Sequence, residues 1–332
     1  MHERAMGEKS VIEAIRDAMR EEMRRDERVV VLGEDVGARG GVFLATQGFV
    51  EEFGEGRVID TPLAEASIAG IALGAALKGL RPIAEIQFAD FAWPAFNQLL
   101  GEAARACYGS NGQVRVPLVV RIPYGGGIRG GLYHSQNVEA YFFHTPGVKV
   151  VAPATPYDAK GLLKAAIRDD NPVIFLEHKK TYRLVRGYVP DEEYVVPIGK
   201  ADVKHRGSQI TLVSYGLVLH YCLQAARTVA QDGISVEVVD LRTLRPLDRE
   251  TLFDSVRKTG KVLIVHEDNL TGGVGAEIAA LLAEEVFEYL DAPILRLCGP
   301  DVPTMPFAPT LEDAYMPTTE KIVGALRRLA AY

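Results

Sequence analysis

The sequence predicts an α/β protein with two successive domains, each built around a mostly parallel sheet. Short apolar runs rich in β-branched residues recur along the chain, and segments with helical periodicity separate most of them. A polar stretch at 178–209 then interrupts this alternation, which restarts beyond it. We therefore expect a first domain over 1–190, a linker over 191–209 and a smaller second domain over 210–332.

The first domain is expected to open with a helix, because Ser10 and Glu13 have the spacing of a capping box. A later helix is predicted to begin after Thr155, with Pro156 in its first turn, and to end near Asp169. The runs expected to form strands of the first sheet are 28–33, 57–60, 81–88, 117–124, 149–154 and 172–177.

The helix predicted over 64–78 consists almost wholly of Ala, Gly, Ser, Ile and Leu. A helix without a polar face must be buried. It can pack inside its own domain or against a second subunit, and the sequence leaves both alternatives open.

The second domain repeats the alternation of strands and helices. Its expected strands are 210–216, 235–242, 261–266 and 293–298, and its last two helices are expected over 274–290 and 318–331.

Composition excludes several classes of protein. The net charge of −7 lacks the basic character of a nucleic-acid-binding protein. The charged start of the chain has no secretory apolar core, and no run of about 20 apolar residues could cross a membrane, so we expect a cytoplasmic protein without a membrane partner. The three cysteines are widely spaced and predict neither a disulfide framework nor a zinc site.

Residues 125–130 spell G-x-G-x-x-G directly after an apolar run, which is the pattern of a dinucleotide-binding turn. That turn must open a long helix, and an acidic residue should end the next strand. Neither feature is present, because the loop continues into "LYHSQ" and the run at 149–154 ends without Asp or Glu. We reject the nucleotide interpretation and ask what else a glycine loop ending in His134 serves.

Two ionisable residues are candidates for chemistry. Glu65 begins the apolar helix, where a carboxylate ordinarily just stabilises the helix dipole but is also suited to proton exchange with a ligand. His134 follows a strand of a parallel sheet, where ligands commonly bind, although a histidine that caps the next segment is the plainer interpretation. His144 lies between aromatic residues and a turn, which favours a structural role. Most aromatic residues of "IQFADFAWPAFNQ" are expected in the core, although one could stack on a planar heterocycle.

Six stretches of the sequence together carry a family resemblance: "VVVLGEDVG", "DTPLAEASIAG", "AEIQFADF", "RIPYGGGIRGGLYHSQ", "PATPYDAKGLLKAAIRDDNPVIFLEHKKTYR" and "VDLRTLRPLD". They resemble the β subunit of the thiamine-diphosphate-dependent decarboxylase component of 2-oxo acid dehydrogenase complexes. The resemblance spans nearly the whole chain in order.

The resemblance implies a transketolase-like fold, with a pyrimidine-binding domain followed by a transketolase C-terminal domain. It also implies an α2β2 heterotetramer that binds the cofactor between α and β subunits and acylates a lipoyl-bearing acyltransferase core. The G-D-G motif that holds magnesium and diphosphate in thiamine enzymes occurs nowhere in this sequence. Magnesium is therefore expected on the α subunit, and this chain supplies half of a site.

Residue roles follow from the same resemblance. Glu65 matches the glutamate that bonds N1′ of the aminopyrimidine and promotes the imino tautomer, which removes the C2 proton. Phe91 matches an aromatic position that packs on the pyrimidine, with Gln87 nearby, and His134 matches a histidine associated with acyl transfer to lipoyl. Four further positions match a structural potassium site, namely Leu118, Ala166, Asp169 and Asn171.

The substrate class is inferred from "FADF", "GGLYHSQNVEAYF" and "EHKKTYR", which lean toward branched-chain 2-oxo acid enzymes over pyruvate or acetoin relatives. A non-catalytic docking subunit is a rival interpretation, against which the presence of both Glu65 and His134 argues. A homodimeric transketolase or deoxyxylulose-phosphate synthase is a second rival, disfavoured by the missing G-D-G motif and the short chain.

Overall fold

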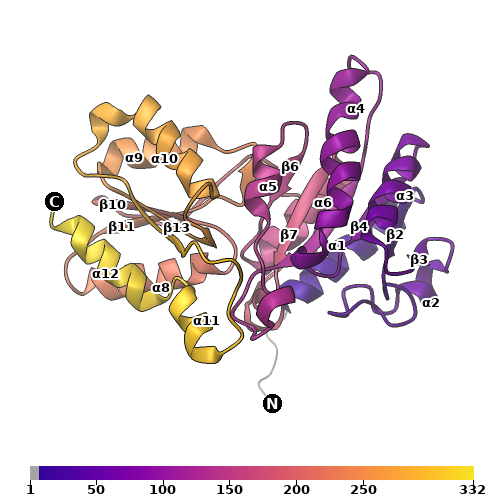
Figure 1. Ribbon diagram of the computed structural model, residues 1–332, viewed down its shortest axis with the longest axis horizontal. Coiled ribbons are helices and arrows are strands. Elements are labelled where there is room, and N and C mark those ends of the chain that lie inside the picture. Colours follow the sequence, from indigo (N-terminus) through magenta and orange to yellow (C-terminus); the bar gives the residue numbers. More distant parts are fainter. Residues whose placement is uncertain (1–6) are drawn as a thin grey trace.

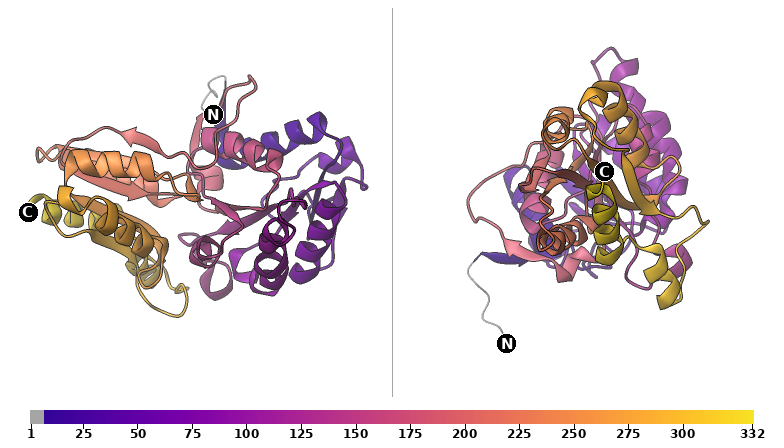
Figure 2. Two further views of the ribbon diagram at one scale, coloured as in Figure 1. Left: turned by 90° about the horizontal axis from the view of Figure 1, so that it is seen from above. Right: turned by 90° about the vertical axis from the view of Figure 1, so that its left-hand side faces the viewer.

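The computed structural model describes residues 7–332 and shows two α/β domains side by side along the long axis of the molecule (Figures 1 and 2). The first sheet has seven strands in the order β12-β6-β7-β5-β4-β2-β3. All neighbouring strands are parallel except the β12–β6 pair. Its strands are β2 (Val29–Gly33), β3 (Val58–Asp60), β4 (Arg81–Glu85), β5 (Val119–Tyr124), β6 (Lys149–Val151), β7 (Val173–His178) and β12 (Thr243–Arg245).

The first sheet is buried on both faces, which explains why its strands are continuous apolar runs. Along β5, Val119 belongs to the core on one face and Val120 to the core on the other. The first core includes residues of α3 (Glu65–Leu77), and the second includes residues of α1 (Val11–Arg25) and α6 (Pro156–Arg168). The remaining helices of this domain are α2 (Phe49–Phe53), α4 (Ala104–Gly109), α5 (Glu139–His144) and α7 (Thr181–Leu184).

The helix starts predicted from the sequence are confirmed. The Ser10 side chain accepts a hydrogen bond from the Glu13 N–H, and the Glu13 carboxylate accepts one from the Ser10 N–H, so the capping box is complete. Thr155 caps α6 through the N–H of Asp158, with Pro156 in the first turn. Local side-chain chemistry therefore determined where both helices begin.

The second sheet has five strands in the order β14-β13-β10-β11-β9. Only β9 runs antiparallel to its neighbour, β11. The strands are β9 (Asp202–His205), β10 (Ile210–Ser214), β11 (Val236–Asp240), β13 (Val262–Asn269) and β14 (Leu295–Gly299). The helices around them are α8 (Val218–Ala230), α9 (Arg249–Thr259), α10 (Val274–Glu285), α11 (Pro309–Tyr315) and α12 (Thr319–Ala330). These elements and the first sheet confirm the expected α/β class.

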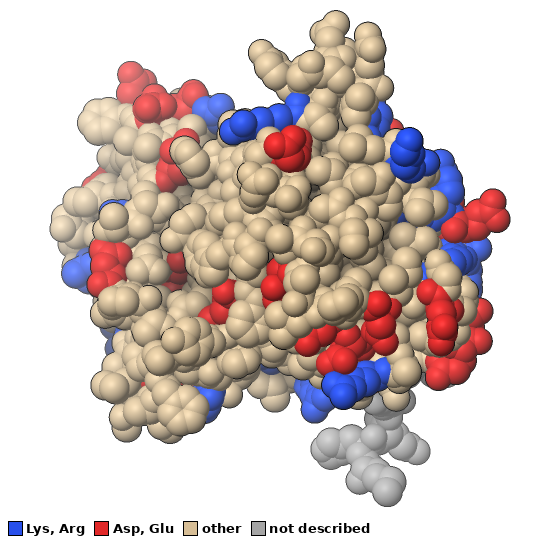
Figure 3. Space-filling model, turned by 45° about the vertical axis from the view of Figure 1, so that its right-hand side comes forward, with Lys and Arg blue, Asp and Glu red and all other residues tan. Residues whose placement is uncertain are grey.

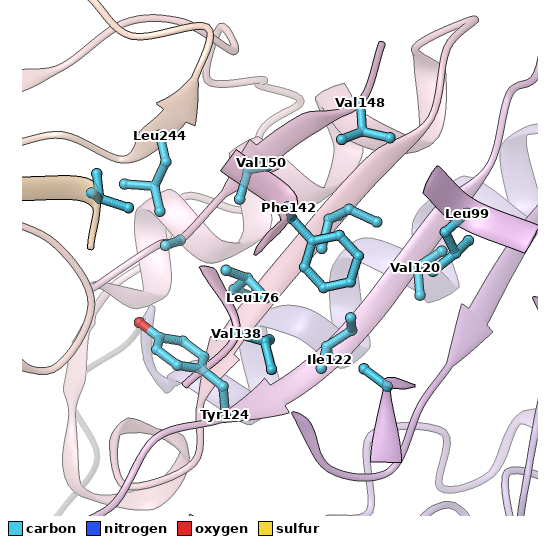
Figure 4. Packing of buried hydrophobic residues seen from close by; sticks show 14 of the residues in the cluster. Leu99, Val120, Ile122, Tyr124, Val138, Phe142, Val148, Val150, Leu176 and Leu244 are labelled. Carbon is cyan, nitrogen blue, oxygen red and sulfur yellow. The ribbon is translucent and has the colours of Figure 1, made fainter. Parts of the chain in front are cut away.

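Two segments connect the domains in ways that the sequence did not indicate. Strand β9 lies within 191–209, so part of the expected linker belongs to the second sheet. Strand β12 returns from the second domain to the edge of the first sheet, where Leu244 joins a core that includes Val150 and Phe142 (Figure 4). A strand of three residues is too short to show a recognisable apolar pattern in the sequence.

Helix α3 buries one side of its apolar surface inside the first domain and exposes the other side. Ile68, Ala72 and Leu73 are buried within the first domain. Ile71 and Leu77 remain 59% and 50% exposed, respectively. The helix therefore packs inside its domain on one side and leaves an apolar strip uncovered on the other.

Candidate active site

The expected site residues follow four adjacent parallel strands. Strands β3, β2, β4 and β5 are neighbours in the first sheet, so their carboxyl ends meet at one edge. Beyond these ends lie Glu65, Glu34, Gln87 and the loop that carries His134, respectively. Ligands of parallel α/β sheets bind outside the carboxyl ends of the strands. The sheet order thus brings together residues that are up to about a hundred positions apart in the sequence.

Two carboxylates and an amide gather at the ends of β2, β3 and β4. Glu65 is the first residue of α3 and is half-buried. The Gln87 side-chain amide donates a hydrogen bond of 3.3 Å to the Glu34 carbonyl oxygen. Burial, reinforced by the negative charges of Asp35 and Glu65, raises the pKa of the Glu34 carboxyl. The negative charge of Glu65 therefore acts on Glu34 at the ends of these strands.

The His134 ring lies against two aromatic rings that follow β4. Its centroid is 4.6 Å from that of Phe88 and 5.6 Å from that of Phe91, and both pairs meet edge to face. Phe88 and Phe91 are themselves in edge-to-face contact at 5.7 Å. His134 itself is an exposed residue. The structure therefore brings the expected His134 and Phe91 into contact and adds Phe88, which touches both rings.

The glycine loop does not offer its N–H groups to a phosphate. Gly126 N–H donates to the Glu267 carboxylate at 2.5 Å, and Gly127 N–H donates to the Glu312 carboxylate at 2.8 Å. Arg129 N–H donates to the same Glu312 oxygen at 3.2 Å. Because protein carboxylates already occupy these donors, the geometry agrees with rejection of the dinucleotide interpretation.

Glu267, His178 at the end of β7 and Lys179 directly after it form a buried group of ionisable residues beneath the loop. His178 Nε2 lies 2.8 Å from the Glu267 carboxylate. Burial opposes ionisation of Glu267, but the His178 ring and the Gly126 N–H outweigh it and lower the pKa of this carboxyl. Lys179 lies over the Phe88 ring, 5.8 Å from its centroid, and burial lowers the pKa of its ammonium to about 8.

The sequence reasoning missed these residues. Glu267 lies near the carboxyl end of β13, a buried strand of a parallel sheet, and its place in "VHED" was a usable signal for a site residue. His178 and Lys179 were assigned to a connecting segment. Glu312 had no local signal, because it contacts the loop from 185 positions away in the sequence.

The expected potassium site already contains protein cations. Arg81 donates to the carbonyl oxygen of Asp169 at 2.6 Å, and Lys149 forms an ion pair with the Asp169 carboxylate. The Ala166 carbonyl accepts from the Asp169 N–H at 3.2 Å, and the Leu118 carbonyl accepts from a β7 N–H at 2.9 Å. Asn171 donates its N–H to the Asp169 carboxylate. This arrangement fits a bound potassium ion poorly.

A cleft of about 1010 Å³ opens between the domains beside the glycine loop. Its wall combines aromatic and acidic side chains, among them Trp93, Tyr141, Asp90 and Asp268. Burial raises the pKa of Asp268 to about 6. Glu65, Gln87 and His134 do not line this cleft, although Tyr133 and Asp90, the sequence neighbours of His134 and Phe91, do.

The cysteines and His144 lie in ordinary structural surroundings. All three cysteines are free, and Cys222 is buried. His144 lies in the last turn of α5, where a basic residue suits the helix dipole. No helix in the described part of the chain is both long and apolar enough to cross a membrane.

Comparisons with known proteins agree with this architecture. The transketolase pyrimidine-binding domain model matches residues 8–185, and the transketolase C-terminal domain model matches residues 199–322. A solved structure described as a split-gene transketolase, an inactive β4 tetramer, has a TM-score of 0.78 and 25% identity, covering 97% of this chain and 98% of that one.

Curated relatives match over nearly their whole length. The 2-oxoisovalerate dehydrogenase subunit beta of Bacillus subtilis is 58% identical over 97% of this chain and 99% of its own. The pyruvate dehydrogenase E1 component subunit beta of the same organism is 45% identical over 98% of this chain and 100% of its own. The corresponding subunit of Staphylococcus epidermidis is 47% identical over 96% of this chain and 97% of its own. The chain therefore belongs to the family of 2-oxo acid dehydrogenase β subunits, with a transketolase pyrimidine-binding domain followed by a transketolase C-terminal domain.

Proposed function

We propose that this chain is the β subunit of a branched-chain 2-oxo acid dehydrogenase, which decarboxylates its substrate oxidatively and acylates a lipoyl group. The single observation that carries the substrate class is the 58% identity to a 2-oxoisovalerate dehydrogenase subunit, against 45% and 47% to two pyruvate dehydrogenase subunits. Pyruvate is the second candidate substrate, on the strength of those two relatives.

The residues at the sheet edge fit the aminopyrimidine ring of thiamine diphosphate. Thiamine diphosphate supplies an electron sink for cleavage of the bond to the carboxyl group. Glu65 would share a proton with a ring nitrogen of the bound aminopyrimidine. Gln87 and Phe91 orient the ring from the end of β4, one through its amide and the other by packing.

His134 acts on the lipoyl group. Its ring contacts Phe88 and Phe91, and the residue is exposed, so an incoming dithiolane can approach it. An imidazolium can donate a proton to the sulfur that is released when the dithiolane opens. His134 therefore protonates that sulfur during acyl transfer.

The site is completed by an α subunit in an α2β2 heterotetramer. The sequence contains no G-D-G motif for magnesium and diphosphate, so the partner chain supplies that half of the site. The uncovered strip of α3 provides an apolar surface. Figure 3 brings forward the right-hand side of Figure 1, where α3 lies, and the central part of that view is largely free of charged side chains. The similar split-gene transketolase chain is described as inactive when four β chains assemble alone, which supports the same dependence.

The substrate class is tested on the reconstituted heterotetramer with a panel of 2-oxo acids and an artificial electron acceptor. We expect kcat/KM for branched-chain 2-oxo acids to exceed that for pyruvate by about tenfold or more, a ratio that one or two additional methyl contacts in a pocket can provide. A preference for pyruvate would contradict the branched-chain assignment and support the second candidate.

A further inference from the structure

The glycine loop presents a series of backbone N–H groups to one side. Gly125, Gly127 and Gly131 have left-handed backbones, with φ of 86°, 76° and 65°, and Arg129 joins them at 61°. Left-handed residues that alternate with ordinary ones turn successive N–H groups into a concave anion site. In this loop the anions are the carboxylates of Glu267 and Glu312, both from the second domain.

Both carboxylates are fixed and removed from water. Glu312 is fully buried and receives the N–H groups of Gly127 and Arg129 as well as the Arg129 guanidinium, at 2.5 Å. Glu267 is 2% exposed and is oriented by His178. Hydrogen bonds to an ionised acceptor in such surroundings are about twice as strong as neutral ones.

Because the glycines of the loop have no side chains, the second domain can approach the loop closely. A Cβ atom at Gly126 would lie 2.5 Å from Cε of Met305, and one at Gly131 would lie 2.7 Å from Cδ2 of Phe307. A larger residue at Gly131 would meet the Phe307 ring, whereas one at Gly126 would displace the flexible end of the Met305 side chain. The glycines thus serve contact between domains as well as conformational freedom.

The far end of the loop is held as well. Gln136 N–H donates to the Asp90 carboxylate at 3.3 Å, and the Gln136 carbonyl accepts from the Gly125 N–H at 3.0 Å, which closes the base of the loop. His134 lies between these fixed points. Its position therefore depends on anchors at both ends of the segment.

We propose that Glu267 and Glu312 are positioning residues, which hold the glycine loop from the second domain and so place His134 for acyl transfer. Neither carboxylate needs to touch substrate or cofactor for this role. The catalytic consequence rests on the proposed function of His134, whereas the restraint on the loop follows from the contacts alone.

The experiment compares four variants in the reconstituted heterotetramer. Glu312→Ala removes the acceptor, Glu312→Gln keeps an acceptor oxygen but loses the ion pair with Arg129, and Asp313→Asn is the matched control. Asp313 is exposed and contacts the Arg129 guanidinium at 2.8 Å. Glu267→Gln tests the second anchor, and gel filtration confirms assembly of each variant.

Hydrogen–deuterium exchange of the peptide containing residues 126–129 measures the restraint. We expect exchange to accelerate by about tenfold or more in Glu312→Ala, less in Glu312→Gln and not at all in Asp313→Asn. Acylation of a free lipoyl domain should fall in the same order, while turnover with an artificial electron acceptor stays within about twofold of the native rate. If Glu312→Ala does not assemble, the graded comparison of Glu312→Gln and Glu267→Gln with Asp313→Asn decides the question.

Unchanged exchange in all three glutamate variants, Glu312→Ala, Glu312→Gln and Glu267→Gln, would overturn the proposal. Accelerated exchange with undiminished acylation would also overturn it, provided that His134→Ala does lose acylation. If His134→Ala leaves acylation intact, the proposed function of His134 fails instead, and accelerated exchange in Glu312→Ala still supports the anchoring of the loop.

Discussion

At the scale of single residues, Glu65 is the residue proposed to activate the thiamine cofactor. Glu65→Gln should preserve the fold and the tetramer, because an amide replaces a carboxylate of the same shape at the start of α3. The amide cannot share a proton with the pyrimidine nitrogen, and loss of a general acid–base group typically costs about 10²–10⁴-fold in rate. Hydrogen–deuterium exchange at C2 of the bound cofactor measures this step, and an unchanged exchange rate would show that the assignment is wrong.

His134 should affect acylation of the lipoyl group but not decarboxylation of the 2-oxo acid. His134→Ala is expected to reduce acylation of a lipoyl domain far more than 2-oxo acid turnover with an artificial electron acceptor, since the latter does not use the dithiolane. Equal losses in both assays would place His134 at substrate binding or decarboxylation. No loss in either assay would leave it with a structural role against Phe88 and Phe91.

Lys179 is expected to reduce stability at neutral pH. Its ammonium has no hydrogen-bond partner among the described residues, and burial lowers its pKa from 10.5 to about 8. The folded state therefore disfavours the charged form below about pH 8, and this cost disappears as the pH rises from 8 toward 10.5. The shift corresponds to at most roughly 3 kcal/mol.

Lys179→Met should accordingly raise the free energy of unfolding at pH 7, and its advantage should shrink above pH 8. Chemical denaturation across this pH range checks the prediction. Lys180→Met is the matched control, because Lys180 is only half-buried and bonds the Tyr221 hydroxyl at 3.1 Å. A destabilised Lys179→Met at pH 7 would mean that attraction to Asp90 outweighs the cost of burial.

At the scale of elements, helix α3 should form part of the subunit interface. Ile71→Glu places a charge on its uncovered strip, where Ile71 is 59% exposed, so the isolated chain should keep its melting temperature while assembly with the α subunit weakens. Phe287→Glu is a matched control, because Phe287 is 70% exposed and lies in the second domain. Analytical ultracentrifugation of the mixtures measures assembly, and equal behaviour of both variants would contradict the interface.

The elements that the sequence predicted are those with strong local signals. The buried strands of both sheets, the Ser10 and Thr155 caps and the apolar α3 all formed where periodicity and capping residues placed them. Strands β9 and β12 were not anticipated, because each has at most four residues and is stabilised by pairing with a distant strand. Short segments of this kind depend on tertiary contacts rather than on their own composition.

At the scale of the whole molecule, the two domains are joined at the glycine loop as well as through the chain. Glu65 and His134 could be selected from the sequence because they follow strands of a parallel sheet, whereas Gln87 was selected through the family resemblance. Glu267 carries a similar signal near the end of β13, but Glu312 does not, and the two reach the loop from 141 and 185 positions away. Sequence patterns identify which residues carry chemistry, whereas contacts between domains determine how they are held.

The central claim is that this chain supplies half of a thiamine diphosphate site, and titration calorimetry tests it most directly. Thiamine diphosphate and magnesium are titrated into the isolated chain and then into the chain mixed with an α subunit that carries a G-D-G motif. The account predicts no tight binding to the isolated chain and magnesium-dependent binding to the mixture, accompanied by 2-oxo acid decarboxylation. Micromolar, magnesium-dependent binding to the isolated chain would contradict it.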